Sequence, residues 1–182
     1  MLDAVASFVR RVDRLNDVVG RSVAWLTLAM VLITFLVVVL RYAFSLGWVW
    51  MQESYVWLHG IVFMLGAGYT LLHGGHVRVD IFYGAKDDRF RAWVDLFGGL
   101  FLLLPVIVLV GWVSWDYVLS SWAKLEESRE AGGLHGLFLL KTVIWGFCVL
   151  VALQGLSLSG RSALILAGRA EFLPAREEHE GI

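Results

Sequence analysis

The sequence has few charged residues and a single cysteine, and both scarcities exclude classes of protein. Only 17% of its 182 residues are charged while 59% are hydrophobic, a composition far from that of an average soluble domain. The formal net charge of -1 provides no general basic field for nucleic acid, so we expect no nucleic-acid partner. The one cysteine, Cys148, has no second cysteine with which to form an intrachain disulfide.

The sequence also lacks the usual signatures of catalysis. It has no phosphate-binding glycine loop, no nucleophile with a base at suitable spacing and no paired acids within one site. No set of His, Cys and carboxylate residues has metal-ligand spacing. We therefore predict a protein that is not an enzyme and that binds neither a metal nor a cofactor.

Long apolar runs are what the sequence does contain. A bilayer core of about 30 Å needs roughly 20 apolar residues in a helix, whose backbone polar groups are satisfied internally. Four charge-free runs approach this length, at 22–40, 54–72, 96–115 and 142–160. We predict an all-α integral membrane protein whose membrane domain, 20–160, has four transmembrane helices at about 20–41, 48–73, 92–119 and 137–160. A charged cytoplasmic tail, 161–182, follows.

The basic residues predict the orientation of these helices. Eleven of the 15 Lys and Arg residues flank one side of the predicted spans, and four flank the other. The four are Arg41, Lys124, Arg129 and Lys141. Because short cytoplasmic flanks are enriched in Lys and Arg, both termini are expected in the cytoplasm.

The first 19 residues form a separate amphipathic pattern. Apolar residues recur at helical spacing, and Arg10, Arg11 and Arg14 lie among them. One interpretation is a helix lying on the cytoplasmic leaflet, with its arginines at the lipid phosphates. The alternative is an ordinary cytoplasmic extension of the first transmembrane helix.

One carboxylate, Glu53, lies just inside the predicted second span. Trp48 and Trp50 precede it and are typical of a membrane interface. An ionised group at this depth needs a partner, because an unpaired charge in hydrocarbon is costly. Among the four cations on that side we consider Arg41 and Lys141 available to Glu53, and we favour Arg41 because the connecting turn is short.

Histidines supply an alternative function. His59 lies near the middle of the second predicted span, and His73 and His76 follow its end. Together they raise the alternative of a four-helix membrane cytochrome that transfers electrons through His59 with His73 or His76. A polar packing contact between helices is the competing interpretation of His59.

The loop after the second span carries an alternating charged segment, HVRVD. If this segment is extended, His76, Arg78 and Asp80 share one side. This side is suited to docking on a partner protein or, through Arg78, on a lipid phosphate. The alternative is a solvated loop of the positively charged cytoplasmic side.

In order and spacing, the stretch from Arg41 to Tyr83 resembles the small membrane subunit of tripartite ATP-independent periplasmic (TRAP) transporters, the DctQ-like family. The segments that carry the resemblance are RYAF, WVWMQE, FMLGAG and HVRVD. The matching positions, which are candidates for structural or subunit contacts, are Arg41, Tyr42, Trp50, Glu53, Gly66, Ala67, His76, Arg78 and Asp80.

This resemblance implies a function in a complex. It implies a scaffold subunit that supports a large (M-type) permease subunit in the inner membrane, with membrane lipids around both. A periplasmic (P-type) substrate-binding protein would deliver an organic acid, and a sodium gradient would drive its uptake. The substrate itself is not implied, because specificity is expected in the other two components.

Overall fold

The computed structural model describes residues 2–76 and 87–173 of the chain. These ranges contain helices and connecting turns but no strand. The elements are α1 (Leu2–Phe44), α2 (Val49–Leu72), α4 (Asp88–Phe97), the π-helix η1 (Gly98–Leu103), α5 (Leu104–Ala123), α6 (Leu137–Leu166) and the short 3-10 helix η2 (Ala170–Phe172). Since α4, η1 and α5 follow one another without a break, four helical segments are long and apolar enough to cross a membrane. The predicted fold class, all-α with four spans, is confirmed.

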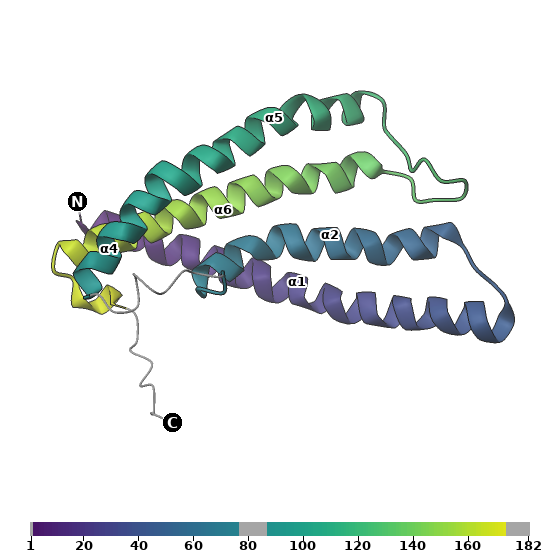
Figure 1. Cartoon of the computed structure of the whole chain (residues 1–182), viewed down its shortest axis with the longest axis horizontal. Helices are drawn as coiled ribbons and strands as arrows, with labels where there is room; N and C mark the ends of the chain where they lie inside the picture. Colours follow the sequence, from purple (N-terminus) through teal and green to yellow (C-terminus); the bar gives the residue numbers. More distant parts are fainter. Residues whose placement is uncertain (1, 77–86, 174–182) are drawn as a thin grey trace.

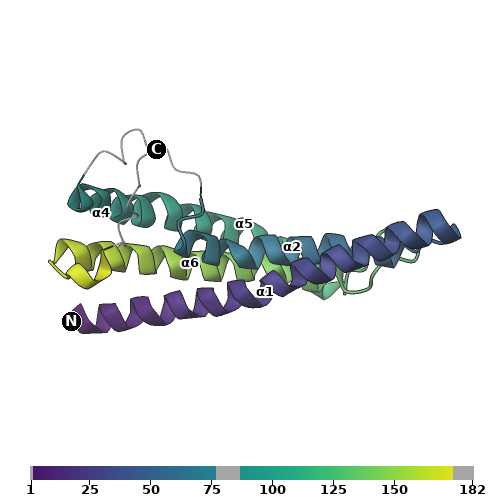
Figure 2. The same ribbon diagram turned by 90° about the horizontal axis from the view of Figure 1, so that it is seen from below.

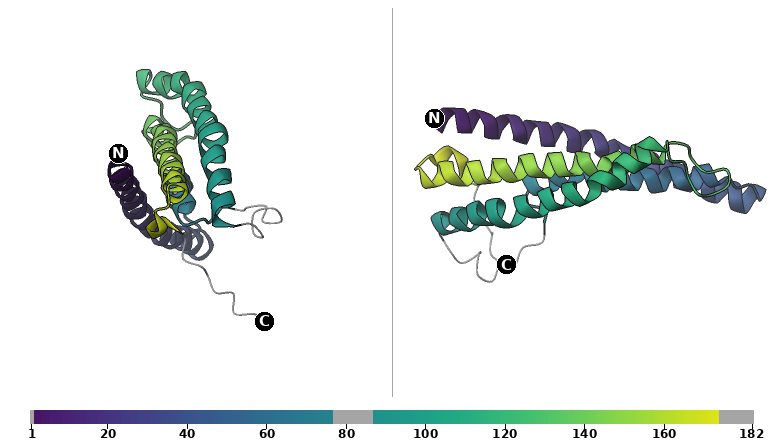
Figure 3. Two further views of the ribbon diagram at one scale, coloured as in Figure 1. Left: turned by 90° about the vertical axis from the view of Figure 1, so that its left-hand side faces the viewer. Right: turned by 90° about the horizontal axis from the view of Figure 1, so that it is seen from above.

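Helix α6 occupies the middle of the bundle. It contacts α1 and α2 on one side and α4, η1 and α5 on the other, as Figure 1 shows. The hairpin formed by α1 and α2 extends along the long axis beyond the ends of α5 and α6 (Figure 1). The views from below and above show α1 as one continuous rod with its first turns beside the C-terminal part of α6 (Figures 2 and 3).

Side-chain contacts show how the hairpin of α1 and α2 is shifted along the long axis relative to α6. A Cβ atom at Gly160 of α6 would lie 3.1 Å from Cγ2 of Val9, and the Asn16 amide reaches the Leu150 carbonyl at 3.5 Å. The charge-free run 142–160 of α6 therefore lies beside the N-terminal part of α1, and the first predicted span, 22–40, is shifted toward the opposite end. We call the end of the bundle that carries Leu2 the N-terminal end.

The amphipathic segment 1–19 belongs to the same helix as the first span. From Leu2 onward α1 is unbroken for 43 residues, a length of about 65 Å. Its buried positions, which face the rest of the bundle, are Ala6, Val9, Val12, Asn16, Gly20 and Val23. This geometry is that of a helical extension of the first span; its position relative to a membrane stays a prediction.

The third span begins earlier and ends later than the sequence indicated, and it contains a change of helix type. The π-helix η1 ends just before Pro105, and the Leu104 N–H donates to the carbonyl of Gly99, five residues back. Proline supplies no N–H and crowds the carbonyl four residues earlier, so the expected kink occurs as a widened helical segment. A Cβ atom at Gly99 would lie 2.5 Å from Ser159 Oγ, so this glycine lets η1 approach α6 closely.

The fourth span is entered through a left-handed turn. Gly136 precedes α6 with φ of 97°, a conformation that glycine adopts without steric cost. Helix α6 then runs to Leu166, six residues past the predicted end. The extra turns pack their small and apolar side chains against Val5 and Val9 of α1.

Candidate functional site

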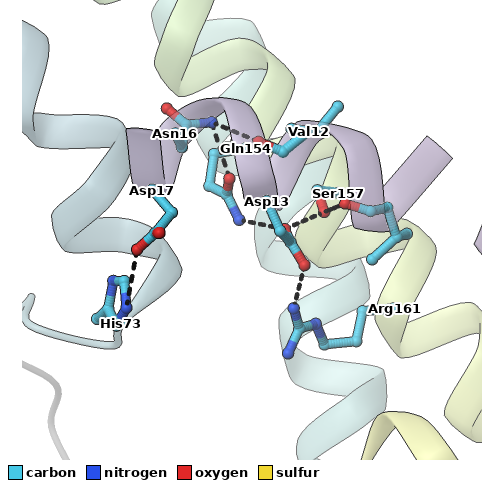
Figure 4. Close-up of polar contacts among 9 residues, drawn as sticks. Val12, Asp13, Asn16, Asp17, His73, Gln154, Ser157 and Arg161 are labelled. Carbon is cyan, nitrogen blue, oxygen red and sulfur yellow. Dashed lines mark hydrogen bonds and ion pairs between the residues drawn. The ribbon is translucent and has the colours of Figure 1, made fainter. Parts of the chain in front are cut away.

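The N-terminal end of the bundle contains a set of connected polar side chains. This polar network consists of Asp13 and Asn16 from α1 and Gln154, Ser157 and Arg161 from α6 (Figure 4). Its members come from two segments that are more than 130 residues apart in the sequence. They meet because residues 9–16 of α1 run antiparallel to residues 150–160 of α6.

Asp13 is the centre of the polar network. Its Oδ1 accepts hydrogen bonds from Gln154 Nε2 at 3.0 Å and from Ser157 Oγ at 2.7 Å. Its Oδ2 accepts a hydrogen bond from the guanidinium of Arg161, with which it forms an ion pair. Both oxygens are therefore satisfied by α6, and the carboxylate fixes α1 to α6.

Asn16 extends the network into the core. Its side chain is fully buried, and Nδ2 donates to Gln154 Oε1 at 2.9 Å. A buried amide between packed helices sets their register, because only one alignment satisfies its donors. Oδ1 of Asn16 has no hydrogen-bond partner among the described residues; a Cβ atom added at Gly68 would lie 2.1 Å from it. Only glycine at position 68 lets α2 approach this side chain.

A second contact joins α1 to the end of α2. The ring of Tyr69 lies on Gly20, where a Cβ atom would be 2.2 Å from the ring. The Tyr69 ring also contacts the His73 ring in a tilted arrangement, with a centroid distance of 4.1 Å. His73 Nε2 lies 3.9 Å from the Asp17 carboxylate (Figure 4). The histidine is thus engaged in helix packing.

At the opposite end of the bundle, Glu53 binds the loop between α5 and α6. Its carboxylate accepts hydrogen bonds from Ser128 Oγ and, at 2.6 Å, from the Leu134 backbone N–H. The favoured pairing with Arg41 was wrong: no ion pair joins these two residues in the part of the chain that the structure describes. The loop offers two donors within reach of α2, whereas Arg41 is exposed at the end of α1. We call this contact the loop tether.

Lys141, the other candidate cation, has a different acid partner. Its ammonium forms an ion pair with Glu126 and lies 4.0 Å from the centroid of the Tyr117 ring. The hydrogen bond from Lys141 holds the pKa of Glu126 below its usual value, and the Glu126 backbone N–H donates to the Ser121 carbonyl at 3.0 Å. The loop is therefore attached to both helices that border it and to α2.

Other residues selected from the sequence lie apart from these two clusters. Tyr42 and Trp50 are exposed, at 83% and 47%, near the connection between α1 and α2. Arg78 and Asp80 lie outside the described residues, so the expectation for the HVRVD segment stays a prediction.

Gly66 and Ala67 lie in a groove on the bundle surface. The groove runs between α1 and α2, reaches α6 at Phe147 and Val151, and has a volume of about 720 Å³. A Cβ atom at Gly66 would meet nothing within 4 Å, in contrast to one at Gly68. His76 also lines the groove. Small residues that open outward leave room for another helix to approach closely.

His59 and His73 cannot bind one haem iron in this arrangement. They are separated by 14 positions, about 21 Å along a helix, which prevents them from binding opposite faces of one iron. His76 follows the end of α2 and lines the groove together with Val62 and Phe63. Within residues 2–76 and 87–173, no three His, Cys, Asp or Glu side chains are grouped as metal ligands.

The comparison with known proteins agrees with the motif order in the sequence. The model of the family described as "Tripartite ATP-independent periplasmic transporters, DctQ component" matches residues 30–164. The chain belongs to the DctQ family. The predicted resemblance is thereby confirmed, and the chain is a multi-pass membrane protein of a transporter-subunit family and not of an enzyme family.

A curated DctQ protein gives a measure of the similarity. The C4-dicarboxylate TRAP transporter small permease protein DctQ of Vibrio cholerae serotype O1 is 27% identical over 113 residues, which cover 61% of this chain and 48% of that protein. The chain thus spans about half the length of this DctQ relative. No solved structure matches the chain.

Sequence reasoning missed most of the polar network in this DctQ chain. Neither Asp13 nor Gln154 is among the residues selected from the sequence. The stripe of buried positions in α1 repeats every three or four residues through Asn16 and Gly20 to Val23. That unbroken period crosses the expected boundary at residue 19 and is the signal that predicts one continuous packed helix.

Proposed function

We propose that this chain is the small scaffold subunit of a sodium-driven TRAP transporter in the inner membrane of a bacterium. In this proposal it supports a large M-type permease subunit, and a P-type periplasmic binding protein delivers the organic acid that is taken up. Both termini lie in the cytoplasm. Membership of the DctQ family supports the part of this proposal that makes the chain a subunit of a TRAP transporter complex.

The groove between α1 and α2 is the structural observation that carries the scaffold function. Its walls include Gly66 and Ala67, two of the positions that resemble the family pattern, and Gly66 has open space in front of it. In a membrane, helices associate through close packing at small residues, since lipid provides little hydrophobic driving force between them. We therefore assign the groove to a helix of the large permease subunit.

The polar groups of the bundle support a scaffold more than a transport pathway. Asp13 and Glu53, two carboxylates that contact other elements of the bundle, accept hydrogen bonds from neighbouring side chains or backbone. Their oxygens are used for helix and loop attachment. Substrate and sodium are then handled by the larger subunit.

Co-purification with the large permease encoded beside this chain tests the proposal. The wild-type chain is expected to form a stable complex. Gly66→Leu is expected to lower the yield of the complex at least ten-fold while leaving the thermal unfolding of the isolated chain unchanged, because the new side chain fills only the groove.

The matched control is Gly98→Leu, at a second glycine whose Cβ position is open. It should co-purify like the wild type. Equal losses for both variants would contradict the assignment of the groove. Uptake of an organic acid by this chain alone in liposomes would contradict the scaffold function itself.

A further inference from the structure

The N-terminal end of α1 carries a basic pocket whose three arginines are not used in packing the bundle. Ser7, Arg10, Arg11, Asp13 and Arg14 line it, and its volume is about 510 Å³. The positions i, i+3, i+4 and i+7 place Ser7 and the three arginines on one face of the helix.

The three arginines keep their positive charge available. Arg10, Arg11 and Arg14 are exposed, and none of them has an ion-pair partner within residues 2–76 and 87–173. Asp13 does not neutralise them, because both of its oxygens are engaged by α6. The pocket is therefore suited to an anion with several acceptor oxygens.

The polar network holds this part of α1 in place. Asp13 lies between the arginines in sequence and is bonded to Gln154, Ser157 and Arg161 of α6, while Val9 packs against Gly160. The arginine backbones are thus fixed before any ligand arrives. Preorganisation of this kind lowers the entropic cost of binding.

An apolar surface follows directly after the arginines. Leu15 lies four positions after Arg11 and is 43% exposed, and Val18 lies four positions after Arg14 and is 54% exposed. Each pair is one turn apart on the same face of the helix. The neighbouring part of α6 falls in the charge-free run 142–160. The surface therefore changes from basic at Arg14 to apolar at Leu15 and Val18, ahead of Arg21, whose charge is paired with Asp17 at 2.9 Å.

We propose that this surface of α1 is a binding site for an anionic phospholipid. The guanidinium groups of Arg10, Arg11 and Arg14 bind the phosphate and headgroup oxygens, with the bidentate geometry that arginine provides. The acyl chains lie along Leu15 and Val18 toward the apolar run. The combination of charge and apolar surface favours a lipid over a free anion, and the site is separate from the groove that contains Gly66.

Native mass spectrometry of the full chain in detergent tests this site. Phosphatidylglycerol and phosphatidylcholine with the same acyl chains are added in turn, and the bound fraction is measured over a titration. The wild type is expected to bind phosphatidylglycerol more tightly. Arg11→Gln combined with Arg14→Gln is expected to lower the affinity for phosphatidylglycerol roughly ten-fold or more, since each arginine near an anionic headgroup contributes several-fold.

Lys124→Gln combined with Arg129→Gln is the matched control, because it removes the same charge from the opposite end of the bundle. It should bind phosphatidylglycerol like the wild type, and Arg11→Lys with Arg14→Lys should retain most of the affinity. An equal effect of the two glutamine pairs would overturn the site in favour of a general charge effect.

A third pair separates a lipid from a free anion. Leu15→Ser with Val18→Ser should weaken phosphatidylglycerol binding several-fold, and inorganic phosphate at the same concentration should not displace the lipid. Displacement by inorganic phosphate, together with unchanged lipid binding by this serine pair, would show a free-anion site and overturn the proposal.

Discussion

At the N-terminal end of the bundle, the polar network joins two long helices through their side chains, whereas at the opposite end Glu53 holds a loop. In the polar network, Asp13 bonds three side chains of α6. In the loop tether, the Glu53 carboxylate bonds one side chain and one backbone N–H of the loop. The first contact determines how helices are aligned, and the second determines the conformation of a connection between them.

This difference predicts different consequences of mutation. Loss of the polar network leaves buried donors and acceptors on two helices without partners, so it should destabilise the whole bundle. Loss of the loop tether releases Ser128 and the Leu134 backbone from α2, while the ion pair of Glu126 with Lys141 still holds the loop to α6 and the packing of α1, α2 and α6 stays intact. Loss of the polar network should therefore lower the unfolding temperature of the whole chain. Loss of the loop tether should instead raise the rate of hydrogen exchange within the loop.

Removal of the central carboxylate is expected to have the largest effect. Asp13→Ala leaves Arg161 without its ion-pair partner and Gln154 Nε2 without its acceptor, and Ser157 Oγ keeps only the longer contact with the Val9 carbonyl at 3.5 Å. Because the Asp13 and Arg161 side chains are 18% and 35% exposed, the loss should stay below that of a fully buried pair, at about 2 kcal/mol. Thermal unfolding of the purified chain in detergent measures it, with an expected fall of about 5 °C in the midpoint.

Asp3→Ala is the control for this variant. Asp3 forms an ion pair with Arg169 near the same end, but its side chain is 86% exposed. No measurable change in the midpoint is expected, because exposed ion pairs contribute little. Equal shifts for Asp3→Ala and Asp13→Ala would mean that the polar network contributes no more than a surface contact.

A smaller effect is expected where α2 meets the network. Gly68→Ala places a methyl group against the fully buried Asn16 side chain and should cost about 1 kcal/mol, the lower end of the range for overpacking. Gly66→Ala, two residues earlier, meets open space and should leave the unfolding midpoint unchanged or slightly raised. If the two alanine variants unfold at the same temperature, the close contact between α2 and Asn16 is not important for stability.

The smallest global effect is expected at the loop tether. Glu53→Ala removes the acceptor of the Leu134 N–H, whose hydrogen exchange should become roughly ten-fold faster, for a local loss of about 1 kcal/mol. Glu53→Gln keeps a carbonyl oxygen and should retain most of this protection. Exchange mass spectrometry of the loop measures both variants. If Glu53→Ala lowered the unfolding midpoint as much as Asp13→Ala, the loop tether would stabilise the whole bundle as strongly as the polar network does.

The sequence predicts the number and type of the elements because the four apolar runs are long and free of charge. The alignment of the helices is harder to predict from the sequence, because it depends on a few contacts between distant segments. Asn16 and Gln154 each have ordinary local contexts, and their bond becomes visible only when α1 and α6 are placed side by side. The boundary expected at residue 19 follows the change in charge along the sequence, whereas the buried stripe of α1 continues past it to Val23.

Glu53 illustrates a second kind of limit. The position of Glu53 inside an apolar stretch predicts that its carboxylate needs a partner, and the structure provides two hydrogen-bond donors. The partner was wrong because proximity in sequence favoured Arg41, while the folded loop supplies Ser128 and the Leu134 backbone. A backbone donor has no signature in a sequence, so the structure was required to find it.

The continuity of α1 has a mechanical consequence. An unbroken helix preserves the angular phase of its side chains from one end to the other, at about 100° per residue. The direction faced by Arg14 is thus linked rigidly to the direction faced by Arg41. Any partner that twists the hairpin between α1 and α2 about the helix axis applies a torque to the lipid-facing arginines at the far end, and a lipid held there resists that rotation.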